Sequence, residues 1–120
     1  MKVLIVDDEP DVRRLAQLCL EQLGGMEVIE ASSAAEGLRR AEAEHPDVVL
    51  LDLMMPRVDG RAALASLREN PASASIPVVF LTARSGEDRQ ALLKAGARGL
   101  LAKPFDPTTL AAQLRAILGV

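Results

Sequence analysis

Short apolar runs alternate five times with segments in which apolar residues recur at helical spacing. The first run, Val3–Val6, is continuously apolar, as in a strand that is buried on both faces. Runs at 48–51, 76–81 and 100–102 predict three more strands, and the shorter, more polar run at 26–30 is typical of an edge strand. Strand–helix alternation favours parallel strands with right-handed crossovers. The pattern therefore predicts an α/β fold, a doubly wound five-stranded parallel sheet with helices on both faces.

Five helices are predicted between and after these strands. A short third helix is expected at 61–69, and Gly24-Gly25 and Gly96 end the first and fourth helices. The other starts are marked by residues that favour a helix N-terminus: Pro10, Ser33 with Glu36 as a capping box, Ser85 with Asp88, and Asp106 before Pro107.

Composition excludes several classes of protein. The chain has 120 residues, of which 49% are hydrophobic and 26% charged, so it is long and apolar enough for one globular core. No run approaches the ~20 apolar residues of a membrane span, and no secretory leader is recognisable. The net charge of −3 is scattered, and the absence of Trp and Tyr argues against direct nucleic-acid binding. We therefore expect a single cytoplasmic domain over residues 1–120, with no membrane contact and no effector domain in this chain.

Polar side chains follow four of the five predicted strands. Asp7 and Asp8 come after the first strand, Asp52 after the third, Thr82 after the fourth and Lys103 after the fifth. Ligands of open parallel sheets bind beyond the carboxyl ends of the strands, where the strand order reverses. We expect these five residues to meet at one edge of the sheet.

The residue types in this set indicate phosphoryl transfer. Three neighbouring carboxylates repel one another unless a cation intervenes, and an all-oxygen ligand set favours Mg²⁺. Lys103 adds a second positive charge, and charge neutralisation and positioning dominate catalysis of phosphoryl transfer. Asp52, at the end of a central strand, is the best candidate for a nucleophilic carboxylate. Thr82 can donate its hydroxyl to a phosphoryl oxygen, and the small Ala83 leaves access.

Taken in order, these residues resemble the receiver domain of two-component response regulators, the CheY-like family. The resemblance covers essentially the whole chain and implies a flavodoxin-like (βα)5 fold with strand order 2-1-3-4-5. The matching motifs are Val6-Asp7-Asp8, Leu51-Asp52-Leu53-Met54-Met55-Pro56, Asp59-Gly60, Thr82-Ala83 and Lys103-Pro104-Phe105.

The resemblance also implies a phosphoacceptor and a metal. Asp52 would accept a phosphoryl group from the histidine of a sensor histidine kinase or a histidine phosphotransfer protein. Mg²⁺, with Mn²⁺ as a substitute, would be bound directly by Asp8, Asp52 and the backbone carbonyl of Met54. Asp7 would act through a metal-bound water.

Further roles are implied around the phosphate. Lys103 would pair with Asp52 or its phosphate, and Thr82 would bind the phosphate with Ala83 beside it. The Lys103-Pro104 peptide bond is expected to be cis, which is uncommon. Output would pass to a downstream protein or to a missing output domain. Arg98-Gly99 lacks an acid common in members that dimerise through that face, so a monomer is expected.

One position departs from the family pattern. Leu100 stands where members usually carry an aromatic ring that turns inward when the threonine moves, and leucine has no ring to move. Coupling could then rest on Thr82 and the loop 84–88. A phosphate sink, or a constitutive interaction domain with weak switching, therefore stays an alternative to a switch. Met54 and Arg84 are expected to tune the phosphate lifetime.

We do not expect an enzyme that acts on a separate substrate. Phosphatases with an aspartyl nucleophile usually carry a second acid two residues later, and Met54 cannot act as an acid or base. Among the remaining residues, Cys19 is expected in the core and His45 at the surface. Arg13-Arg14 is predicted to be a solvated helix face, with a partner surface as the alternative.

Overall fold

Five strands and five helices alternate along the chain in the computed structural model, which describes residues 1–83 and 89–120. The strands are β1 (Lys2–Val6), β2 (Glu27–Ala31), β3 (Val48–Asp52), β4 (Val78–Thr82) and β5 (Gly99–Ala102). The helices are α1 (Pro10–Gln22), α2 (Ala34–Glu44), α3 (Gly60–Glu69), α4 (Arg89–Lys94) and α5 (Leu110–Leu118). All strand pairs are parallel, in the order β2-β1-β3-β4-β5. The predicted fold class and strand order are confirmed.

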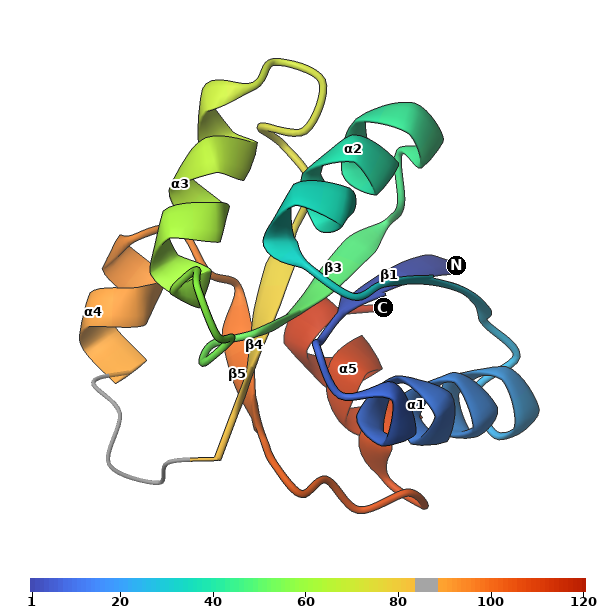
Figure 1. Ribbon diagram of the computed structural model, residues 1–120. Coiled ribbons are helices and arrows are strands. Elements are labelled where there is room, and N and C mark those ends of the chain that lie inside the picture. Colours follow the sequence, from blue (N-terminus) through green and yellow to red (C-terminus); the bar gives the residue numbers. More distant parts are fainter. Residues whose placement is uncertain (84–88) are drawn as a thin grey trace.

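The sheet is covered by helices on both faces, with α1 and α5 on one side and α2 and α3 on the other (Figure 1). Alternate residues of β1 enter different cores. Leu4 and Val6 pack with α2, α3 and α4, whereas Val3 and Ile5 pack with α1 and α5. Every residue of β3 and β4 is buried. This two-sided burial is the reason that these strands read as continuous apolar runs.

Most element ends agree with the pattern to within one residue, and two starts differ by two residues or more. β4 begins at Val78 and not at residue 76; the preceding Pro77 has no N–H to donate and contributes only its carbonyl, to the N–H of Val49. α5 begins at Leu110 and not at Asp106-Pro107. The carboxylate of Asp106 accepts from the backbone N–H and the hydroxyl of Thr108, which forms a turn ahead of the helix.

The helix caps were predicted in part. Ser33 accepts a hydrogen bond from the N–H of Glu36 at the start of α2, as the capping box requires. The Glu36 carboxylate in turn accepts from the N–H of Ser32, one residue before the cap. The proposed cap formed by Ser85 and Asp88 lies outside the described residues.

Three further observations concern burial and the surface. Cys19 is buried on α1, where burial raises the pKa of its thiol, and His45 is exposed at the end of α2, as expected for both. In the described ranges, no helix combines the length and apolar character needed to cross a bilayer.

Candidate functional site

Backbone hydrogen bonds extend the parallel ladders beyond the strand ends and position the site. Asp7 follows β1 and its N–H donates to the carbonyl of Ala31 at 3.1 Å. Lys103 follows β5, and its N–H donates to the carbonyl of Thr82 at 2.9 Å. Asp52 and Thr82 are themselves the last residues of β3 and β4. Polar residues from four strands are therefore fixed at one edge of the sheet by main-chain geometry.

Lys103 is the centre of the charged site. Its ammonium Nζ lies 2.9 Å from Asp7 Oδ2, 3.3 Å from Asp52 Oδ2 and 3.4 Å from Glu9 Oε1. Burial alone would lower the pKa of Lys103, but the hydrogen bond and charge of Asp7, followed by those of Asp52, raise it. Lys103 is therefore a permanent cation between two buried carboxylates.

Asp52, at the end of β3, is buried almost as completely as Asp7, with 2% of its surface exposed. Burial raises the pKa of Asp52. The N–H of Met54, which donates to Oδ1 at 3.1 Å, lowers this pKa but does not offset the effect of burial. The charge of Asp7 raises this pKa further and the charge of Lys103 lowers it. The carboxylate is thus held in a fixed orientation with more negative charge around it than one lysine neutralises.

Three carboxylates form a cluster that could hold a metal. Oxygen atoms of Asp7, Asp8 and Asp52 lie within 4.8 Å of one another, with Asp7 and Asp52 buried and Asp8 exposed. Hard oxygen donors that are partly open to solvent suit Mg²⁺, which keeps several of its own waters. The donor set therefore fits the ion that the sequence implied.

The neighbouring loop is shaped by a glycine. A Cβ on Gly60 would lie 2.9 Å from the carbonyl oxygen of Asp52 and 2.9 Å from Leu53 Cα, too close for any other residue without a backbone shift. The N–H of Gly60 donates to the Leu53 carbonyl at 2.9 Å. Met54 pairs with Asp59 in an isolated antiparallel bridge, which folds the loop back beside the end of β3.

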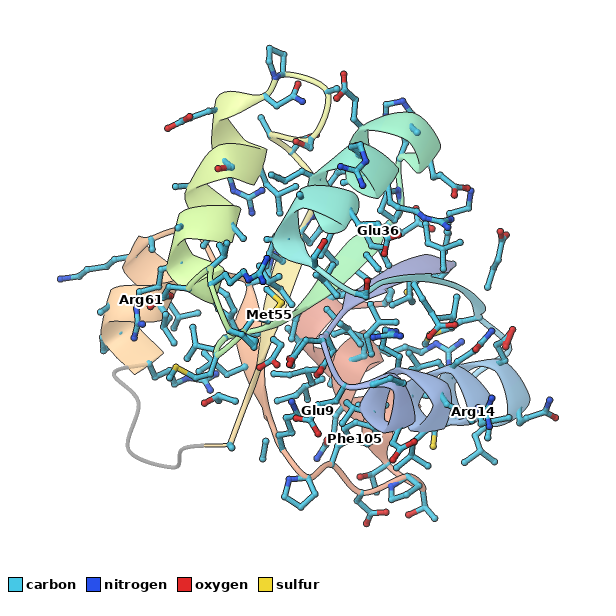
Figure 2. The ribbon with its side chains drawn as sticks, viewed as in Figure 1. Glu9, Arg14, Glu36, Met55, Arg61 and Phe105 are labelled. Carbon is cyan, nitrogen blue, oxygen red and sulfur yellow. The ribbon has the colours of Figure 1, made fainter. Side chains whose placement is uncertain are left out.

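Arg13 also stabilises the site. Its contacts correct the prediction that Arg13 belongs to a solvated helix face. Its Nη1 donates to the carbonyl of Asp7 at 2.6 Å, and its Nε lies 3.2 Å from Glu30 Oε1. Arg14 is exposed on α1, in agreement with the prediction (Figure 2). One residue of the arginine pair therefore fixes the β1–α1 connection, and the other faces solvent.

A pocket of about 520 Å³ opens onto Asp52 and Lys103. Figure 2 shows Glu9 and Phe105 close together, between the start of α1 and the segment after β5. The walls of the pocket combine apolar side chains with two acids: Val12, Leu15, Met54, Pro104 and Phe105, with Glu9 and Asp11. The pocket therefore borders both the buried carboxylate of Asp52 and the ammonium of Lys103.

The remaining predicted positions are found at the ends of β4 and β5 and within β5. Thr82 is 7% exposed, and the small Ala83 lines the pocket. The Lys103–Pro104 peptide bond is cis. Leu100 is partly buried and packs against the core beneath α2, α3 and α4.

Glu9 and Arg13 were missed as site residues by sequence reasoning. The acid directly after Asp7-Asp8 was a signal for Glu9, because a third consecutive carboxylate must lie close to the first two. No spacing in the sequence pointed to Arg13, whose partners are the main-chain carbonyl of Asp7 and the carboxylate of Glu30 on β2.

Comparison with known proteins identifies the class to which this fold and site belong. The model of the response regulator receiver domain family matches residues 3–115, and the chain belongs to this family. It is 43% identical over 119 residues to response regulator Rre1 of Synechocystis sp.. It is 40% identical over 118 residues to the alkaline phosphatase synthesis transcriptional regulatory protein PhoP of Bacillus subtilis. These alignments cover 98% of this chain but 52% and 48% of the relatives, so the chain spans about half their length.

Solved structures give the same family. The chain superposes on chemotaxis protein CheY4 of Vibrio cholerae with a TM-score of 0.88 and 33% identity, covering 97% of both chains. A putative response regulator from Chloroflexus aurantiacus gives a TM-score of 0.86 with 34% identity, over 99% of this chain and 98% of the other. The predicted receiver-domain identity is therefore confirmed by sequence and by fold.

Proposed function

We propose that this receiver domain is a Mg²⁺-dependent phosphoacceptor in a His-to-Asp phosphorelay, with Asp52 as the acceptor. The observation that carries the proposal is the position of Asp52. Its carboxylate is buried within the acidic cluster, in contact with the Lys103 ammonium, and it borders the pocket. Family membership supports a phosphohistidine on a sensor histidine kinase or a phosphotransfer protein as the donor.

The metal would be held by the carboxylates of Asp8 and Asp52 with the Met54 carbonyl, and Asp7 would contribute through a water. When bound, Mg²⁺ supplies positive charge against the oxygens of the transferred group. Mn²⁺, which accepts the same oxygen donors, would substitute. Asp8 is suited to a metal that is exchanged with solvent because it is the exposed member of the cluster.

The chain's own residues do the rest of the positioning. An Asp52 oxygen attacks phosphorus, the bond from phosphorus to the donor nitrogen breaks, and the nitrogen keeps the electron pair. Lys103 neutralises the charge that accumulates on the phosphoryl oxygens, and the Thr82 hydroxyl binds one of them beside Ala83. Hydrolysis by water later releases inorganic phosphate and restores the carboxylate.

We propose that this cycle is confined to the domain's own phosphoryl group and that the domain is not an enzyme for external substrates. Met54 occupies the position where aspartyl phosphatases need a second acid, and a thioether cannot exchange a proton. Turnover of a generic phosphomonoester in the presence of Mg²⁺ would contradict this assignment.

Output would pass to a partner. Relatives of about twice this length are named as transcriptional regulators, which supports a downstream output domain or target protein as the receiver of the signal. The same similarity favours a switch over a phosphate sink or a constitutive interaction domain. Leu100 would then act through packing against the core below α4, because it carries no ring to reorient.

Incubation with acetyl phosphate and Mg²⁺, followed by mass spectrometry of the intact protein, tests the proposal. We expect the mass gain of one phosphoryl group, which is lost in base and absent from Asp52→Asn. Asp59→Asn is the matched control, because asparagine also caps a helix and Asp59 lies on the neighbouring loop. A gain that persists in Asp52→Asn, or no gain in the wild type, would overturn the assignment.

A further inference from the structure

Lys103 has a third carboxylate partner besides Asp7 and Asp52. Glu9 Oε1 lies 3.4 Å from Lys103 Nζ, and the Glu9 side chain is 60% exposed. Glu9 occupies the N-cap position of α1, yet its side chain makes no capping hydrogen bond. Its carboxylate instead lies on the wall of the pocket that leads to Asp52 (Figure 2). The contact with Lys103 is therefore not a by-product of helix capping.

We propose that Glu9 is a positioning residue that shares Lys103 with Asp52 and thereby slows phosphorylation by small anionic donors. This inference rests on the proposed function and deepens it, because it concerns which phosphodonors the site accepts. Glu9 itself does not contact the reacting atoms. It acts through the lysine and through its charge at the entrance.

The charge on the Asp52 side chain changes during transfer. An Asp52 oxygen forms the new bond to phosphorus, the bond to the acetate oxygen breaks, and acetate leaves with the electron pair. The charge on the Asp52 side chain changes from −1 to −2, so Lys103 has more negative charge to neutralise at this moment. Contacts of 3.3 and 3.4 Å on one nitrogen place the two carboxylates within about 7 Å of each other. One charge at that distance in a largely aqueous setting corresponds to about a threefold to tenfold change in rate.

The surroundings of Glu9 strengthen this effect. Asp11 lines the same pocket, so a doubly negative donor meets two acids before it reaches Lys103. A donor protein can offset these charges with its own basic residues, whereas acetyl phosphate cannot. The entrance thus discriminates against small metabolites that carry an activated phosphate.

The test compares the second-order rate of phosphorylation by acetyl phosphate at saturating Mg²⁺ in four proteins. Glu9→Gln should react about threefold to tenfold faster than the wild type at low ionic strength. Glu9→Asp, which keeps the charge, should stay near the wild type. Glu69→Gln, at the exposed end of α3, makes the same charge change away from the pocket and should have no effect. The gain in Glu9→Gln should shrink at high salt, because the carboxylate is largely exposed.

A second readout does not depend on phosphorylation. The side-chain ¹⁵Nζ resonance of Lys103 should shift in Glu9→Gln and stay unchanged in Glu69→Gln. Equal phosphorylation rates in Glu9→Gln and the wild type, or an unchanged Lys103 resonance, would overturn the role of Glu9 while leaving Asp52 as the acceptor. Failure of the wild type to be phosphorylated at all would overturn the proposed function and this inference with it.

Discussion

Removal of the Lys103 charge is the sharpest test of the charge balance at the site. In Lys103→Met the aliphatic stem is approximately kept, and the ammonium between Asp7 and Asp52 is lost. The two carboxylates have 0% and 3% of their side-chain surface exposed, so bulk water cannot solvate the charge of either. We expect a less stable protein whose stability depends steeply on pH.

The magnitude follows from the contacts that are lost. Removing one partner of a buried ion pair costs about 3–5 kcal/mol, because the other partner keeps its desolvation penalty. We expect the low end, ~3 kcal/mol at neutral pH, since the acids can take up a proton in compensation. At about 4 °C per kcal/mol for a chain of this size, the melting temperature should fall by roughly 10–15 °C.

The sign of the pH dependence is fixed by the pKa of Asp52. This pKa is already raised by burial, and the loss of Lys103 raises it further above its unfolded value of about 3.9. The native state then holds a proton more tightly than the unfolded state does. The contribution of Asp52 to stability should therefore be fully present below about pH 4 and be lost as the pH rises through the folded pKa.

Urea denaturation from pH 4 to pH 8 measures this difference. Lys94→Met, at the exposed end of α4, is the matched control and should leave the free energy of unfolding nearly unchanged. The double variant Lys103→Met/Asp52→Asn should recover much of the loss at neutral pH. A pH-independent loss, or a double variant that is as unstable as the single one, would refute the charge-balance argument.

Three further outcomes are expected. Gly60→Ala should cost about 1–3 kcal/mol in urea denaturation, because its Cβ would lie 2.9 Å from the Asp52 carbonyl; unchanged stability would show that the loop can move away. Arg13→Met should cost about 1–2 kcal/mol by loss of the charged hydrogen bond to the Asp7 carbonyl, and equal melting temperatures would contradict that role. Mg²⁺ at tenfold excess over its dissociation constant should add about 1.4 kcal/mol of stability, measured by thermal unfolding, and Asp8→Asn should remove most of this gain; an equal gain in that variant would remove Asp8 from the ligand set.

The fold was largely predictable because β1, β3 and β4 are buried on both faces. Continuous apolar runs such as Val3–Val6 and Val48–Leu51 alternate with segments of helical periodicity, and in such a chain buried parallel strands are the simplest explanation for them. The convergence of the acids was predictable for the same reason, since parallel strands bring their carboxyl ends to one edge. The strand order came from the family resemblance and not from the pattern.

The unpredicted details depend on side-chain directions and turns. Whether Glu9 capped α1 or contacted Lys103 could not be decided from spacing, because acids are favoured at helix starts for either reason. The start of α5 was misplaced because Asp106 and Pro107 are equally typical of a turn before a helix, and Thr108 decided between them. Arg13 was taken for a surface residue, since long cations on helices usually face water.

The ion pair between Asp7 and Lys103 joins residues that are 96 positions apart. During synthesis the ribosome releases Asp7, Asp8 and Asp52 long before β5 and its lysine emerge. An incomplete chain therefore carries the acids without the cation that neutralises them, and the parallel sheet has no fifth strand to carry one. Nascent or truncated chains that end before Lys103 should consequently be poorer recipients of the signal than the chain that includes it.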